Sequence, residues 1–327
     1  MKILLANDTA LERHVGCLAV SDGHARLIGE AGHEITERLF IGALDHHVGV
    51  TDDALVVSLG ADDALLARID SVDAVVVNGE GTIHHGRGRP LLALLALAQA
   101  RGKPTLLVNA VFQETAGFDD TLKRLDDFTV RESRSLEHAR SRGLTARRTP
   151  DAILAARFSV SPPRGSGEFV TDGHWQCQET RDILAAMQAE TGARLLSLME
   201  PDLVANWRET PSGLAGARML ITGRHHGAYL ALLADVPFVA LASNTFKLEG
   251  LTEDLGRPDL MAHSLDDVRA IRNRLLDEGL DSRALLRRLT GDEPISSFRL
   301  LGRGGLNRAE AEVARLEADL EAQGVAA

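Results

Sequence analysis

The feature that most constrains the fold is a regular alternation of short apolar segments with longer helical patterns. In the first half of the chain, strands are expected at 2–6, 34–40, 74–78, 105–110, 128–131 and 145–149. Helices are expected between them, at 15–30, 62–69, 91–101, 119–126 and 135–141. Buried strands separated by helices are typical of a parallel sheet covered on both faces. The pattern therefore predicts an α/β unit.

The alternation stops at 159–167, a segment rich in Ser, Pro and Gly that predicts a linker, and then resumes. Later strands are expected at 168–171, 194–198, 219–222, 238–242 and 260–262, with helices at 179–190, 228–234, 248–255 and 265–276. We therefore predict two Rossmann-like domains, at 1–160 and 168–300, facing a cleft. Residues 301–327 are expected to form a C-terminal amphipathic helix packed on a domain surface.

Composition narrows the class of protein. The chain has 327 residues and a formal net charge of −11, with no basic stripe, which argues against nucleic acid as a partner. Cys17 and Cys177 lie far apart and fit no metal spacing. The apolar start is too short for a signal peptide, and no apolar run could cross a bilayer, so we expect a cytoplasmic protein.

The stretch 219–230 is the best candidate site. It predicts a buried strand, a glycine turn and the first turn of an apolar helix, and Arg224, His225 and His226 lie where that helix begins. A helix N-terminus presents free N–H groups and the positive end of the helix dipole. These residues predict an anion site with an imidazole ready for proton transfer, although a strand–turn–helix joint with one basic residue is also common without a ligand.

Other polar residues follow strands of the predicted first sheet, where ligands of open α/β sheets bind. Asn7 and Asp8 follow the first strand, and Arg131 ends a later one. The loop 78–90 brings Gly79, Glu80, Gly81, His84 and His85 together with two arginines. His84 holds the position of the third glycine of a dinucleotide fingerprint, so the loop gives little support to NAD binding.

Three histidine doublets, His46–His47, His84–His85 and His225–His226, raise the question of a metal. Adjacent residues point in different directions on a helix or a strand, so a doublet rarely chelates one ion. No H-E-x-x-H motif or cysteine pair is present, and we expect no metal. The sequence also lacks the nucleophile elbow of serine hydrolases and the P-loop.

Taken together, these motifs resemble the polysaccharide pyruvyl transferases. The resemblance extends from the first strand to about residue 256, and the order and spacing of its motifs are more specific than any one of them. They are Gly79–Gly81, Val130–Ser135, Pro150–Asp151, Ile221–Gly227, Val236–Leu241 and Lys247. The resemblance implies a GT-B-like fold and an enzyme of cell-surface glycan biosynthesis that transfers pyruvate from phosphoenolpyruvate to sugar hydroxyls, usually as a ketal.

The resemblance also implies roles for individual residues. Arg131 and Arg224 would hold the phosphate and carboxylate of the donor, and His226 would be the general acid/base. The further expected donor-binding residues are Gly79, Glu80, Gly81, His225, Ser243, Asn244 and Lys247. The expected acceptor-binding residues are Asn7, Asp8, His84 and His85. Phosphoenolpyruvate would be a co-substrate, with no cofactor, and the acceptor would be a glycan or a lipid-linked sugar.

Two alternatives stay open from the residues. One is a GT-B-type glycosyltransferase in which Arg224, Lys247 and Glu249 surround the diphosphate and ribose of a nucleotide sugar. The other is a non-catalytic anion-binding protein on the same fold. The sequence leaves peripheral membrane contact and the oligomeric state open.

Overall fold

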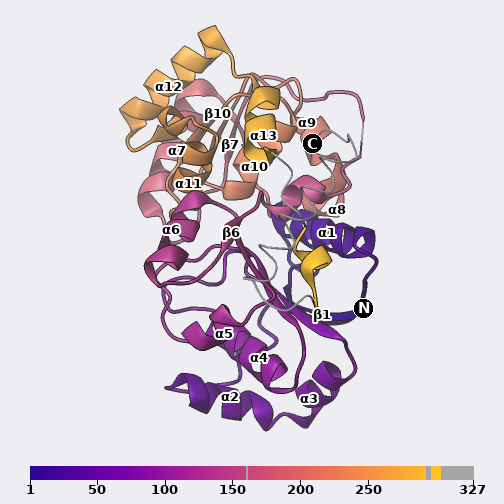
Figure 1. Cartoon of the computed structure of the whole chain (residues 1–327). Helices are drawn as coiled ribbons and strands as arrows, with labels where there is room; N and C mark the ends of the chain where they lie inside the picture. Colours follow the sequence, from indigo (N-terminus) through magenta and orange to yellow (C-terminus); the bar gives the residue numbers. More distant parts are fainter. Residues whose placement is uncertain (160, 292–295, 303–327) are drawn as a thin grey trace, which may run out of the picture. The chain divides into compact units, whose positions relative to one another are not determined.

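The computed structural model describes residues 1–159, 161–291 and 296–302. The chain divides into two compact α/β units, and strands and helices alternate along it (Figure 1). The first unit contains Met1–Leu11, His24–Asp151 and the described residues 296–302. The second contains Glu12–Gly23 and the described part of Ala152–Gly291.

The first unit is built on a six-stranded sheet with the order β2-β1-β3-β4-β5-β6. Every neighbouring pair of strands in it is parallel. The strands are β1 (Lys2–Asp8), β2 (Glu34–Phe40), β3 (Ala74–Asn78), β4 (Thr105–Ala110), β5 (Asp127–Val130) and β6 (Arg147–Arg148). Its helices are α2 (Asp52–Gly60), α3 (Asp63–Asp70), α4 (Arg89–Ala100), α5 (Asp119–Lys123) and α6 (Ser133–Ser141), with the short η4 (Ser297–Leu300).

Alternate residues of β1 serve the two faces of this sheet, because successive side chains of a strand point to opposite sides. Leu4 and Ala6 belong to the core beneath α2 to α5, of which α4 and α5 lie side by side in Figure 1. Ile3 and Leu5 pack in a second core with Ile28 and with η4. Burial on both faces explains why Ile3, Leu4, Leu5 and Ala6 are apolar in succession.

The second unit has a five-stranded sheet with the order β11-β10-β9-β7-β8, again parallel throughout. Its strands are β7 (Glu168–Thr171), β8 (Arg194–Leu196), β9 (Met219–Thr222), β10 (Phe238–Leu241) and β11 (Met261–Ala262). Its longer helices are α7 (Gln178–Thr191), α10 (His225–Leu233), α11 (Lys247–Asp254), α12 (Leu265–Glu278) and α13 (Ser282–Thr290). The short ones are η1 (Ala152–Ala155), α8 (Pro201–Ala205), η2 (Trp207–Glu209), α9 (Thr210–Leu214) and η3 (Pro258–Leu260).

Both sheets reverse their strand order once. The reversal lies between β1 and β3 in the first unit and between β7 and β9 in the second. Ligands of open α/β sheets bind beyond the carboxyl ends of the strands at such reversals. The loops after these four strands are therefore the places to look for a site.

The unit boundaries differ from the expected 1–160 and 168–300. The long segment of the first unit, His24–Asp151, ends before residue 160, and helix α1 (Val15–Glu30) is divided between the two units. Val15 and Ala19 pack in the core of the second unit with Ile153, whereas Ile28 packs in the first. Most of the expected C-terminal helix at 301–327 lies outside the described residues. Among the described helices, none combines the length and the apolarity needed to cross a membrane.

Candidate functional site

The strongest candidate site is the turn between β9 and α10. Arg224 is the N-cap residue of α10, and its backbone N–H donates to the Thr222 hydroxyl at 3.0 Å. The same hydroxyl lies 3.0 Å from the Thr171 hydroxyl at the end of β7. An ideal Cβ on Gly227 would lie 2.3 Å from Thr222 Oγ1, so only glycine lets the first turn of the helix approach these hydroxyls. The turn is thus built to a single geometry.

The side chain of Arg224, after β9, is held by Asp172, which lies after the neighbouring strand β7. Its Nε donates to Asp172 Oδ2 at 2.8 Å, and its Nη2 forms an ion pair with the same oxygen. Asp172 directly follows β7, the neighbour of β9 in the sheet. Both side chains are partly exposed, at 18% for Arg224 and 21% for Asp172. The carboxylate therefore fixes the Nε–Nη2 side of the guanidinium and leaves Nη1 for a ligand.

His226 is the second residue of α10 and is 7% exposed. Its ring rests on the first turn of α1, where an ideal Cβ on Gly16 would lie 2.0 Å from His226 Nδ1 and 2.2 Å from Cγ. The ring centroid of His14 is 5.8 Å from that of His226, with the two planes tilted by 59°. The start of α1 therefore forms one wall of the site, and Gly16 makes room for the imidazole.

His14 is held in a defined orientation as a neutral imidazole. Its Nδ1 accepts hydrogen bonds from the backbone N–H of Gly16 at 3.1 Å and of Cys17 at 3.4 Å. Burial lowers the pKa of His14 well below its usual value, and the charges of His226, Arg224 and Lys247 lower it further. A neutral histidine beside His226 results, because desolvation and nearby cations both disfavour the imidazolium form.

Lys247 adds a second cation to the same unit. It is the first residue of α11, and its Nζ donates to Asn244 Oδ1 at 2.6 Å. Ser243 Oγ lies 3.4 Å from that same oxygen. Lys247 and Arg224 both act on the Cys177 thiol, because their positive charges lower its pKa, whereas burial raises it. Two cations and a helix N-terminus at one sheet edge favour an anionic ligand.

His225, the other half of the doublet, is 3% exposed, and its ring centroid lies 5.1 Å from that of Tyr229. It therefore packs beside an aromatic ring of its own helix. Its expected contact with a donor stays a prediction.

Asn7 and Asp8 end β1, and the loop that begins at Gly79 follows β3, so these expected residues lie at the reversal between the two strands. Asn7, at a φ of 56°, donates from Nδ2 to the Asn78 carbonyl at 2.7 Å and to Thr82 Oγ1 at 3.0 Å. The Glu80 backbone N–H donates to Asn78 Oδ1 at 3.1 Å. An ideal Cβ on Gly79 would lie 2.5 Å from the Ala110 side chain, so this glycine permits close packing of β3 against β4. The expected loop is therefore an ordered polar network.

Three further expected residues take part in pairs of their own. Asp8 is 1% exposed and forms an ion pair with Arg38. His84 and His85 face each other through their Nδ1 atoms at 2.8 Å, and His84 Nε2 lies 3.0 Å from the Gly81 carbonyl oxygen. These contacts hold the glycine loop in shape, and an acceptor role for these residues stays a prediction.

Arg131 is a buried partner of Asp151. The guanidinium is 2% exposed, and its Nη1 donates to Asp151 Oδ2 at 2.8 Å; the Asp151 side chain is fully buried. The pair joins the residue after β5 to Asp151, the last residue of the segment His24–Asp151. The contacts in the described structure are thus structural, and donor binding by Arg131 stays a prediction.

Sequence reasoning did not select Asp172, His14, Gly16 or His24 as site residues. Asp172 follows a strand, which is the same signal that identified Arg131. His14 and Gly16 lie just before and within the first turn of a predicted helix, but that helix was not expected to enter the second unit. His24 is 2% exposed, and its Nε2 lies 3.2 Å from Asn78 Oδ1.

Gly16 offers a direct test of this geometry. We expect Gly16→Ala to push the His226 ring out of place, because the new methyl group would overlap the ring itself rather than a flexible chain end. Overpacking of this kind typically costs about 1–3 kcal/mol. We expect at least a roughly tenfold loss of turnover in steady-state assays at unchanged folded content. Gly29→Ala, on the same helix with open space around the added Cβ, is the matched control and should behave as the parent. Equal activity of the two variants would contradict this packing.

Comparisons with solved structures confirm the fold. Over 97% of this chain and 98% of the other, the chain is similar to UDP-N-acetylglucosamine 2-epimerase from Rickettsia bellii, with 12% identity and a TM-score of 0.52. The chain also matches MurG from Acinetobacter baumannii, with 12% identity and a TM-score of 0.45 over 97% of this chain and 99% of the other. A third match is UDP-GlcNAc 2-epimerase from Methanocaldococcus jannaschii, with 10% identity and a TM-score of 0.45 over 97% of this chain and 99% of the other. At such identities the likeness shows the GT-B-like fold alone.

Among curated proteins, none matches the chain. The family model of polysaccharide pyruvyl transferases, in contrast, matches residues 44–245. This span is more than half of the chain and contains Arg131, Arg224 and His226. The chain therefore belongs to the polysaccharide pyruvyl transferase family.

Proposed function

We propose that this protein transfers pyruvate from phosphoenolpyruvate to sugar hydroxyls and forms a ketal during glycan biosynthesis. Membership of the family supports a transferase that acts on glycans. The observation that carries the donor assignment is the N-terminus of α10, where Arg224 and His226 lie two residues apart, with the charge of Lys247 nearby. A dianionic or trianionic donor suits such a turn.

The donor chemistry fits these groups. Phosphoenolpyruvate carries a phosphate and a carboxylate, and both are anions that a guanidinium binds through charge-assisted hydrogen bonds. The N-terminus of α10 adds N–H groups and the positive end of its dipole. In this proposal Arg224 Nη1 and Lys247 Nζ receive the donor, while Asp172 keeps the guanidinium oriented.

The reaction needs a proton donor and a proton acceptor. Protonation of the donor methylene carbon makes C2 electrophilic, and one sugar hydroxyl adds there and loses its proton. Departure of the phosphate regenerates an electrophilic C2, to which a second hydroxyl adds with loss of its proton. One hydroxyl proton thus replaces the proton given to carbon, and the other leaves with the phosphate, so the ketal and inorganic phosphate are the products.

His226 is the proposed group that moves these protons. Histidine suits both directions of transfer near neutral pH. A neutral His14 beside it leaves His226 as the imidazole of the pair that takes and returns a proton. No metal and no cofactor enters this proposal, since arginine and lysine neutralise the phosphate. The proposed acceptor is a glycan or a lipid-linked sugar, with Asn7, Asp8, His84 and His85 as proposed contacts.

Donor binding can be measured before any acceptor is known. We expect calorimetry to show phosphoenolpyruvate binding to the parent protein and about 10- to 100-fold weaker binding to Arg224→Ala, because hydrogen bonds to charged groups contribute about 1.5–3 kcal/mol. Arg269→Ala is the matched control, since Arg269 pairs with Glu190 on the surface. If the protein binds nucleotide sugars and not phosphoenolpyruvate, the proposal is contradicted and a glycosyltransferase is favoured. If it binds none of these donors, the non-catalytic alternative is favoured.

A further inference from the structure

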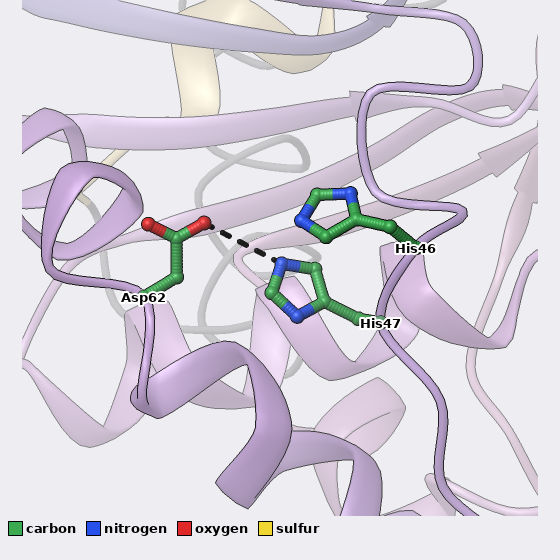
Figure 2. A group of neighbouring side chains, drawn as sticks. All are labelled: His46, His47 and Asp62. Carbon is green, nitrogen blue, oxygen red and sulfur yellow. Dashed lines mark ion pairs between the residues drawn. The ribbon is translucent and has the colours of Figure 1, made fainter.

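A second group of side chains with ligand chemistry lies in the first unit, apart from the residues used above. His46 and His47 belong to the loop between β2 and α2, and Asp62 is the N-cap residue of α3 (Figure 2). One ligand atom from each lies within 4.8 Å of the other two. His47 Nε2 is 3.5 Å from Asp62 Oδ2. The three side chains thus converge on one point.

The backbone explains why this doublet departs from the expectation that adjacent histidines diverge. That expectation holds for helices and strands, whereas His46 ends a run of turns. The two ring centroids are only 4.1 Å apart, with the planes tilted by 39°. Figure 2 shows both rings pointing from the loop toward Asp62. Two imidazoles are therefore presented to the same carboxylate.

His47 already has the environment of a metal-ligating histidine. It is 8% exposed, and its Nδ1 lies 3.3 Å from Ser58 Oγ, which orients the ring. Its Nε2 is buried and makes no hydrogen bond, although it faces the Asp62 carboxylate. Metal-binding histidines typically use one nitrogen for the ion and the other for such an orienting contact.

The two carboxylate oxygens of Asp62 make different contacts. Its Oδ1 caps α3 by accepting from the Leu65 N–H at 3.0 Å, and its Oδ2 faces His47. The cap holds the carboxylate in place, and the second oxygen remains able to bind an ion.

We propose that His46, His47 and Asp62 form a binding site for a borderline divalent ion, with Zn²⁺ as the preferred occupant. Two imidazoles and one carboxylate are ligands that zinc accepts, and water would fill the fourth position. Bonds of about 2.0–2.2 Å would draw the three ligand atoms to roughly 3.3 Å from one another. His46 is exposed and can make that movement. The ion would link the β2–α2 loop to the start of α3 and would stabilise the first unit.

The test uses the full chain without any purification tag, stripped with a chelator and titrated with Zn²⁺ at pH 7.5 against a chromophoric competitor. We expect one ion per chain and at least tenfold weaker binding in His46→Ala and in Asp62→Asn. Asparagine is as good an N-cap as aspartate, so the second variant removes the ionic ligand while α3 stays capped. His263→Ala, at an exposed histidine of the second unit, should bind as the parent does.

Two readouts accompany the titration. Zn²⁺ should raise the Tm of the parent and leave that of both variants unchanged, because only an ion that binds the folded state stabilises it. Mg²⁺ should leave the Tm of the parent and of the variants unchanged, since Mg²⁺ requires oxygen ligands. Equal zinc affinity in parent, His46→Ala and Asp62→Asn, or the absence of a one-to-one site, would overturn the proposal and leave His47 and Asp62 as a simple ion pair.

Discussion

Replacing His226 with alanine is expected to lower pyruvyl transfer about 10²- to 10⁴-fold, which is the usual contribution of a general acid–base group. The imidazole lies beside the neutral His14 and rests on Gly16, and neither neighbour can replace it. His14 has its Nδ1 committed to two backbone N–H groups and a pKa held low by burial. In the proposed mechanism, removal of His226 therefore removes the group that moves the proton.

Binding of the donor should survive the same change, because the proposed phosphate and carboxylate contacts come from Arg224, Lys247 and the helix N-terminus. The measurement is phosphate release in the presence of an acceptor pool, set beside calorimetric binding of phosphoenolpyruvate. His263→Ala serves as the histidine control, since it lies exposed beside α12. Parent-like turnover in His226→Ala would remove this residue from the mechanism, and combined loss of binding and turnover would assign it to the donor site instead.

Replacing Arg131 with alanine is expected to destabilise the first unit by about 3–5 kcal/mol. The change removes the Nη1 hydrogen bond and the positive charge that face the fully buried Asp151 carboxylate, and the loss of one partner of a buried ion pair is costly. Denaturant unfolding is the measurement, and the effect should fall on the transition of the first unit, since a chain of two units need not unfold in one step.

A paired substitution separates the structural role of Arg131 from the predicted role in donor binding. Arg131→Met combined with Asp151→Leu removes both charges, and such replacements of a buried ion pair by apolar residues are often neutral or stabilising. We expect this double variant to recover most of the lost stability. Phosphoenolpyruvate affinity measured on it then reports on the donor contact alone. A loss below about 1 kcal/mol in Arg131→Ala would contradict the buried pair, because exposed ion pairs are the ones that contribute so little.

The secondary structure of this chain was predictable where a short segment of strand-forming residues lies between clear helical patterns. The expected bounds of β2, β3, β4, β7 and β9 match those of the structure. Helix α2 was not expected, because its sequence carries two adjacent valines and no clear apolar stripe. It forms where Thr51 caps its first turn and where Leu55 and Leu59 pack in the core with α4. Burial of Leu55 and Leu59 in the tertiary structure thus made this segment a helix, although its intrinsic helix propensity did not predict one.

The sequence by itself was enough to select the candidate residues that lie on one local turn. Arg224 and His226 could be selected as candidates because a strand, a glycine and a helix N-terminus adjoin in sequence, an order that favours anion binding. Asn7 and Glu80 could be placed at one sheet edge, since parallel strands end together. In each case the physical cause acts within a few residues or follows from the strand pattern.

Only the tertiary structure decided which distant residues complete the sites. Asp172 meets Arg224 because β7 and β9 are neighbours in the sheet, and His14 meets His226 because the first turns of α1 pack in the core of the second unit. Asp62 meets His46 and His47 through the packing of α2 and α3. Strand order and the division of a helix between two cores depend on many weak contacts summed over the fold, and no short segment of the sequence contains that sum.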